Sequence, residues 1–239
     1  SLLHVIKRAG FRVVWLDNQS GCKGTCDGLD TWRPSTTTTP KLCNGDNCLD
    51  EALLIGARQI VEGSRDNLVL VMHQLGNHGP AYFKRYPAEF RKFTPTCDSS
   101  DLGRCTREEV VNAYDNALLY TDHALAQTID FLKSQQATHD TAMIYVSDHG
   151  ESLGERGLFL HGVPYSIAPD VQLEVPMVMW FSPGYASSFS LRTDCLRQRA
   201  QQPATHDNLF HTVLGLLDIS TRVRDRQMDL GEACRDGRR

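Results

Sequence analysis

Acidic and imidazole side chains gather in VSDHGESLGERGLFLHG, a segment near the middle of the chain. Asp148 and His149 are adjacent, a glycine and Glu151 follow them, and His161 precedes another glycine. A carboxylate oxygen and a neutral imidazole nitrogen together suit Zn²⁺, and a glycine allows the sharp turn that brings neighbouring side chains to one ion. A bare Asp-His pair is more often a turn cap beside a solvated histidine. The surrounding residues favour the other interpretation, in which Asp148 and His149 are candidate metal ligands.

A third histidine has a similar context. His78 is followed by a glycine and lies in the loop after a predicted buried strand at residues 67–73. In open α/β sheets the loops at the carboxyl ends of the strands form the ligand-binding crevice, so His78, His149 and His161 are expected to converge. Four other histidines are predicted to have packing or hydrogen-bonding roles: His73, His123, His206 and His211.

Lys23 is a candidate for binding a phosphate group. It lies between Cys22 and Cys26 in the segment GCKGTC. If a disulfide joins these cysteines, the short loop presents one ammonium and several backbone N–H groups, which suits a phosphate oxygen. A lone lysine is more often a solvated surface charge, so both interpretations stay open.

Aromatic and basic residues are interleaved in AYFKRYPAEFRKF, residues 81–93. Such a segment could meet an anionic lipid surface, where both kinds of side chain share the interface. A partly buried surface helix has much the same pattern. The two interpretations have equal support at this stage.

The hydrophobic pattern predicts strands that alternate with helices. Residues 11–17, 67–73, 141–147 and 175–182 are short apolar runs typical of buried strands, whereas helical spacing covers 1–10, 49–62, 107–135 and 207–219. Thr106 and Glu109 have the spacing of a capping box at the start of the longest helix. The predicted class is therefore α/β, with a mostly parallel central sheet flanked by helices, and residues 31–41 are predicted to form an exposed connector.

Composition and length favour one globular domain. Hydrophobic residues make up 41% and charged residues 23% of the 239 residues, and the net charge of −4 argues against a nucleic-acid-binding protein. No apolar run approaches the roughly 20 residues that span a bilayer, so we expect this chain to be soluble. Because Ser1 begins inside a predicted helix, we also expect the chain to be the C-terminal part of a larger protein.

Eight cysteines indicate an oxidised, extracytoplasmic domain, and the first six form three close pairs in loops. A Cys₄ zinc site is the competing interpretation for the first four, but their spacings are not those of zinc knuckles. Eight cysteines allow about 105 pairings, so the connectivity stays open. The disulfide candidates are Cys22, Cys26, Cys43, Cys48, Cys97, Cys105, Cys195 and Cys234.

Three long motifs resemble a known family. WLDNQSGCKGTCD, NHGPAYFKRYPAEFRKFTPTC and SDHGESLGERGLFLHGVPYSIAP are similar to the periplasmic catalytic domain of the phosphoethanolamine–lipid A transferases, which include the MCR-type colistin-resistance enzymes. The resemblance covers nearly the whole chain. It implies an alkaline phosphatase/sulfatase-type α/β fold and a location at the periplasmic face of the bacterial inner membrane, with the full-length protein anchored in that membrane as a monomer.

The resemblance also implies a reaction. One or two zinc ions act in the family, and a zinc-activated threonine attacks the phosphorus of phosphatidylethanolamine. Diacylglycerol leaves, and the phosphoethanolamine then passes to a lipid A phosphate, which confers polymyxin and colistin resistance. By this resemblance Asp148 and His149 correspond to zinc ligands, and His78 and His161 to a pair that binds substrate phosphate or a second zinc. The corresponding substrate-binding positions are Asn18, Gln19, Lys23 and Glu151.

Two departures from the family pattern limit these expectations. The family's nucleophilic threonine and one ligand glutamate lie upstream of the point where this sequence begins, and Gln19 stands where related sequences tend to carry Asn. We therefore expect the 239 residues alone to bind metal weakly and to transfer nothing.

Two other functions remain as alternatives. Another enzyme of the alkaline phosphatase superfamily, a phosphodiesterase or sulfatase-like hydrolase, would transfer the group to water, although no cysteine begins the C-x-P-x-R motif of sulfatases. A binding module braced by disulfides would hold a phosphate or lipid headgroup without turning it over.

Overall fold

The computed structural model describes residues 1–45 and 47–236, and its centre is a parallel sheet. β1 (Arg12–Asp17) lies between β2 (Asp30–Trp32) and β5 (Leu68–His73), and both neighbours run parallel to it. Because the strands are buried on both faces, β1 is almost continuously apolar. This arrangement confirms the predicted α/β class.

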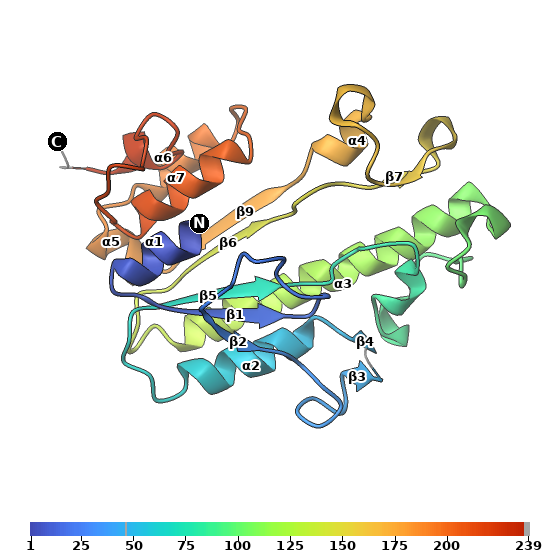
Figure 1. Cartoon of the computed structure of the whole chain (residues 1–239), viewed down its shortest axis with the longest axis horizontal. Coiled ribbons are helices and arrows are strands. Elements are labelled where there is room, and N and C mark those ends of the chain that lie inside the picture. The colour runs from blue at the N-terminus through green and yellow to red at the C-terminus, as the bar shows by residue number, and fades with distance from the viewer. Residues whose placement is uncertain (46, 237–239) are drawn as a thin grey trace.

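Helices cover both faces of this sheet (Figure 1). α1 (Leu2–Arg8) and α7 (Asp207–Leu216) pack with Val13 and Trp15 on one face. On the other face Val14 and Leu16 pack against α2 (Glu51–Val61) and Phe131 of α3 (Arg107–Ser134). The alternation follows from the two-residue period of a strand, which sends successive side chains to opposite faces.

Two further strands form a separate pair. β6 (Ala142–Val146) and β9 (Met177–Phe181) are antiparallel, and they are not hydrogen-bonded to the β2-β1-β5 sheet. The sequence predicted the positions of these two strands but not their separate antiparallel pairing. An apolar run indicates that a strand is buried, but it carries no information about the strand's direction or neighbours.

The remaining elements are short. β3 (Cys43–Asn44) with β4 (Asn47–Cys48), and β7 (Ser152–Leu153) with β8 (Phe159–Leu160), form antiparallel pairs. Part of the predicted connector at 31–41 is ordered as the end of β2, which is too short to show a period in the sequence. The other helices are α4 (Asp170–Leu173), α5 (Pro183–Ser188) and α6 (Thr193–Arg199), and the 3₁₀ turns are η1 (Tyr82–Lys84), η2 (Ala88–Phe90), η3 (Leu102–Arg104), η4 (Glu155–Gly157), η5 (Tyr165–Ile167) and η6 (Glu232–Cys234).

The start of α3 confirms the predicted capping box. The backbone N–H of Glu109 donates to Oγ1 of Thr106, and the Glu109 carboxylate accepts from the Thr106 N–H. Two N–H groups that have no partner inside the helix are thereby satisfied, an arrangement worth about 1 kcal/mol. The helix begins near β7, where Arg107 pairs with Glu155, and its C-terminal part packs against the parallel sheet through Phe131.

All eight cysteines form disulfides: Cys22–Cys26, Cys43–Cys48, Cys97–Cys105 and Cys195–Cys234. The disulfide interpretation is confirmed, and the competing Cys₄ zinc site is wrong because its sulfur atoms are already paired. Among the described residues, no helix is both long enough and apolar enough to cross a membrane.

Candidate active site

Three of the predicted histidines converge beyond the carboxyl ends of β5 and β6. The ring centroids of His149 and His161 are 3.8 Å apart, and the ring of His78 lies 5.4 Å from His161 and 6.5 Å from His149. His78 comes from the loop after β5, and His149 follows β6. The predicted convergence of these loops is confirmed.

In two of these rings, Nδ1 makes a hydrogen bond to a backbone carbonyl oxygen. Nδ1 of His78 is 2.8 Å from the carbonyl oxygen of Gly79, and Nδ1 of His149 is 2.9 Å from that of Gly150. A carbonyl oxygen only accepts, so each Nδ1 carries the hydrogen. Each Nε2 is left with a lone pair that could bind a metal or accept a proton.

A buried carboxylate orients the third ring. Oε1 of Glu151 lies 2.6 Å from Nδ1 of His161, and the Tyr82 hydroxyl donates to Oε2 over 2.6 Å. The Glu151 side chain is only 4% exposed, and Tyr82 is fully buried. Burial, together with the hydrogen bond to Glu151 and its charge, raises the pKa of Tyr82, so this hydroxyl keeps its proton and donates it.

These groups form a candidate metal site. One ligand atom each from His149, Glu151 and His161 lies within 4.8 Å of the others. Asp148 is beside this cluster: its Oδ2 is 3.8 Å from Nε2 of His149, and its side chain is 85% exposed. Two imidazoles and a carboxylate are donors that Zn²⁺ accepts.

The loop that carries His149 is fixed by contacts with α4. The Gly150 N–H donates to the carbonyl oxygen of Gln172, and the Gln172 side chain donates to Oγ of Ser152. A Cβ atom at Gly150 would lie 2.1 Å from the carbonyl oxygen of Val171. Only glycine allows this close approach, which explains a glycine directly after His149.

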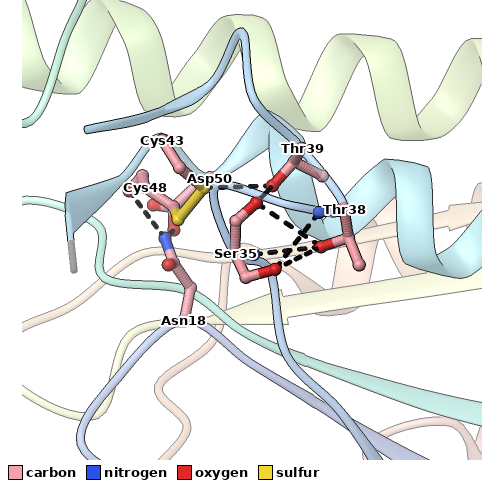
Figure 2. Close-up of a disulfide and its surroundings, with 7 residues drawn as sticks. All are labelled: Asn18, Ser35, Thr38, Thr39, Cys43, Cys48 and Asp50. Atoms are coloured by element: carbon pink, nitrogen blue, oxygen red, sulfur yellow. Dashed lines mark hydrogen bonds between the residues drawn. A yellow bond between two sulfur atoms is a disulfide. The ribbon is translucent and has the colours of Figure 1, made fainter. Parts of the chain in front are cut away.

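Asn18 is part of a hydrogen-bonded cluster around the Cys43–Cys48 disulfide (Figure 2). Its Nδ2 donates to the carbonyl oxygen of Cys48 and to Oδ1 of Asp50, so neither amide hydrogen is available to a ligand. Asp50 also accepts from the N–H groups of Leu75 and Gly76, after β5. Burial raises the pKa of Asp50, against the opposing effect of these hydrogen bonds. The Cys43–Cys48 disulfide closes the hairpin that supplies the carbonyl group.

The other two predicted substrate positions are held differently. The Gln19 side chain donates to the carbonyl oxygen of Gln74, 3.1 Å away. Lys23 is one of the three residues between Cys22 and Cys26, which a disulfide joins, and it has a φ of 47°. Its ammonium group pairs with no side chain of the described residues, so it is free to meet an anion. A left-handed lysine is strained, and such strain concentrates at functional sites.

The aromatic side chains of residues 81–93 mostly face inward. Tyr82 and Tyr86 are buried, and Phe90 packs edge-on against Tyr120 of α3 at a centroid distance of 5.1 Å. The segment forms the turns η1 and η2 instead of one surface helix. Its aromatic residues therefore anchor the segment to α3, and the interpretation as a lipid-facing surface loses its support.

A second acid–imidazole pair lies at the ends of β1 and β5. Oδ1 of Asp17 is 2.7 Å from Nδ1 of His73, and the Arg33 guanidinium lies 3.1 Å from Oδ2. The sequence pointed to a packing role for His73 but did not reveal its partner. The one available signal was that both residues end predicted strands.

His206 likewise has a structural role, since its Nε2 donates to the carbonyl oxygen of Ser147 over 2.8 Å.

Comparison with known proteins agrees with this geometry. The family model described as Sulfatase matches residues 1–219. The chain belongs to the sulfatase family. Within this family it is 43% identical over 235 residues to the phosphoethanolamine transferase EptA of Escherichia coli K12, and 39% identical over 234 residues to the phosphatidylethanolamine transferase Mcr-1 of Escherichia coli. These matches cover 98% and 95% of this chain.

A solved structure shares the fold of this chain. The soluble domain of lipooligosaccharide phosphoethanolamine transferase A from Neisseria meningitidis superposes with a TM-score of 0.94 at 42% identity, covering 99% of this chain and 71% of that one. The chain spans less than half the length of the curated relatives, 43% of EptA and 42% of Mcr-1.

Proposed function

We propose that this chain is the larger part of the catalytic domain of a zinc-dependent phosphoethanolamine transferase, with phosphatidylethanolamine as donor and a lipid A phosphate as acceptor. The convergence of His78, His149 and His161 is the observation that carries the proposal. The names of the relatives also support the proposal. They describe phosphoethanolamine transferases, and one of the names includes the word lipooligosaccharide. The parent protein would act at the periplasmic face of the inner membrane.

The donor set fits zinc. Nδ1 of His149 donates a hydrogen bond to a backbone carbonyl group, which leaves Nε2 available as a metal ligand. A ligand atom of the Glu151 carboxylate lies within 4.8 Å of the His149 ligand atom, so one ion could contact both. Metal-binding histidines are usually held in this way by a hydrogen bond on the other ring nitrogen. His149, Glu151 and His161 would hold the ion, with Asp148 at its edge. A bound zinc ion supplies Lewis acidity, which neutralises charge that develops on a nucleophile or phosphoryl oxygen.

The other side chains act on the substrate. Lys23 is proposed to bind the phosphate oxygens, because an ammonium donates to an anion. His78, whose Nε2 carries a lone pair, is proposed to bind a protonated phosphate oxygen or a second zinc ion. Tyr82 and Glu151 keep His161 in one orientation and thereby direct its second nitrogen toward the proposed metal site. The nucleophile is proposed to be a threonine outside these residues. Its oxygen–phosphorus bond forms as the phosphorus–oxygen bond to diacylglycerol breaks, and the threonine proton leaves on the diacylglycerol hydroxyl. A lipid A phosphate oxygen then forms a bond to phosphorus, and the threonine oxygen leaves and regains a proton.

A chimera tests this proposal. In the chimera, this chain replaces the matching 235-residue segment of Escherichia coli EptA. Lipid A is extracted from cells that express the chimera, and its mass is measured by mass spectrometry. We expect lipid A to gain a phosphoethanolamine group and the cells to tolerate more colistin. His149→Ala is expected to lower both the zinc content of the purified chimera and the transfer rate, the latter by about 100-fold or more, since even the loss of a ligand's hydrogen-bond partner costs roughly 10–100-fold.

His139→Ala is the matched control, because His139 lies in the turn after α3 and its side chain bonds only to the neighbouring Thr138 among the described residues. It should leave zinc content and transfer unchanged. Release of free phosphoethanolamine without modified lipid A would show a hydrolase instead of a transferase. Normal zinc and normal transfer in His149→Ala would remove His149 from the metal site.

A further inference from the structure

An uncharged, partly exposed segment carries His161. Residues 157–169, GLFLHGVPYSIAP, contain no Asp, Glu, Lys or Arg, although such residues make up 23% of the chain. Tyr165 is 83% exposed and Ile167 is 71% exposed, and both belong to η5. Pro164 and Pro169 flank this turn and restrict its backbone. Two large apolar side chains are thus presented to the outside by a short turn with limited freedom.

This turn is fixed to the histidine cluster on both sides. Before it, β8 pairs with β7, and β7 lies directly after Glu151. After it, Gln172 of α4 bonds to Gly150 and to Ser152. Figure 1 shows β7 and α4 close together at one end of the molecule. Any surface that η5 touches is therefore held close to His149 and His161.

The chemistry of the turn fits the interface of a phospholipid bilayer. A tyrosine has an apolar ring and a polar hydroxyl, and such residues concentrate at the level of the lipid headgroups. An isoleucine beside it can enter the boundary of the acyl chains, 5–10 Å deep by analogy with interfacial helices. Because the segment has no lysine or arginine, attraction to anionic lipids does not drive this contact. The partner it fits is a zwitterionic lipid surface, of which phosphatidylethanolamine is one component.

We propose that η5, through Tyr165 and Ile167, inserts into the headgroup layer of a phospholipid bilayer and so places His161 at the depth of the lipid phosphates. This inference rests on the proposed function, in which the donor is a phospholipid. It adds a docking surface on this chain that brings the site to the donor's headgroup without extracting the lipid from the membrane.

Vesicle sedimentation tests the docking surface. The 239-residue chain is mixed with sucrose-loaded vesicles of phosphatidylcholine and phosphatidylethanolamine, and the partition coefficient is measured over a range of lipid concentrations. We expect lipid-dependent binding, and a decrease of about tenfold for Tyr165→Ser or Ile167→Ser, since an apolar side chain of this size contributes roughly that factor when it leaves water. Both side chains are exposed, so neither substitution should alter the unfolding transition.

Val223→Ser is the matched control, because Val223 is 54% exposed in the segment after α7 and should not affect binding. In Tyr165→Trp, lipids brominated on their acyl chains should quench the added fluorescence beyond the background of Trp15, Trp32 and Trp180. The inference is overturned if the chain does not bind these vesicles, if only anionic vesicles bind, or if the two serine variants bind as the parent does. Vesicle binding with no transfer by the chimera would refute the proposed function and leave this surface in place.

Discussion

At the scale of single residues, the Tyr82 hydroxyl determines how Glu151 is presented. Tyr82→Phe removes that one donor from a buried carboxylate, and we expect the protein to lose roughly 1–3 kcal/mol of unfolding free energy because the oxygen has no replacement partner. Zinc affinity should also decrease, by about 10-fold to 100-fold, since the carboxylate that orients His161 becomes mobile. Urea titrations and competition with a chromogenic chelator measure the two effects.

Tyr114→Phe is the control for this substitution. The Tyr114 ring packs edge-on against Tyr82 at a centroid distance of 5.4 Å, and its hydroxyl has no hydrogen-bond partner among the described residues. It should leave both measurements nearly unchanged. Native zinc affinity in Tyr82→Phe would mean that Glu151 needs no orienting partner.

Sequence reasoning identified the histidines but missed the tyrosine for a physical reason. His78, His149 and His161 each precede a glycine in a loop where a ligand crevice forms, so local pattern was enough. Tyr82 and Glu151 are 69 positions apart, and Tyr82 is one of several aromatic residues in a repetitive segment. A contact between distant positions depends on the packing of the whole chain, which local spacing does not contain.

At the scale of elements, the loop between β6 and β7 depends on one close backbone approach. Gly150→Ala would place a Cβ atom 2.1 Å from the Val171 carbonyl oxygen, and a backbone atom cannot rotate away as a side chain can. We expect a loss of roughly 1–3 kcal/mol in unfolding free energy, together with weaker zinc binding because His149 must move with the loop. Thermal unfolding and chelator competition measure both.

Gly103→Ala is the control, because its Cβ would lie 3.4 Å from the Asp101 carboxylate, and it should lower the unfolding free energy much less. Equal losses in the two variants would contradict this account.

The elements predicted from the sequence are those with a long apolar period. α2, α3 and α7 and the strands β1, β5, β6 and β9 all lie where apolar spacing indicated. The antiparallel direction of β9 was missed because a buried run looks the same in either orientation. β7 and β8, which support the site, contain two residues each and are too short to show any period.

At the scale of the whole molecule, one disulfide between distant positions fastens the C-terminal segment to the domain, and ion pairs within the segment stabilise it. The Cys195–Cys234 disulfide spans 39 positions, and closing such a loop contributes about 4 kcal/mol in the chain-entropy account. Asp229, whose side chain is fully buried, pairs with Arg224 and Arg235, each 2.6 Å away. The sequence suggested that these cysteines were oxidised but could not pair them, because spacing favours a partner only for close cysteines.

Glu232 makes the stability of this segment depend on pH. Burial alone would raise its pKa, but a hydrogen bond from Arg226 and the charges of Arg224, Arg226 and Arg235 lower it below the ordinary value of 4.5. The folded state therefore binds the proton less readily than the unfolded state. Its contribution to stability is complete above pH 4.5 and is lost as the pH falls through the lowered pKa.

Glu232→Gln should accordingly cost about 1–2 kcal/mol of unfolding free energy at pH 7, where the ion pairs are intact, because it leaves partly buried guanidinium groups with fewer partners. The difference from the parent should shrink steadily below pH 4.5, as the parent's own carboxylate becomes protonated. Urea titrations from pH 7 downward measure this convergence. Glu174→Gln removes an exposed carboxylate that pairs with no described side chain, and it should leave the pH profile of the parent unchanged. A Glu232→Gln deficit that stayed constant down to acidic pH would show that the residue stabilises the segment by packing and not by its charge.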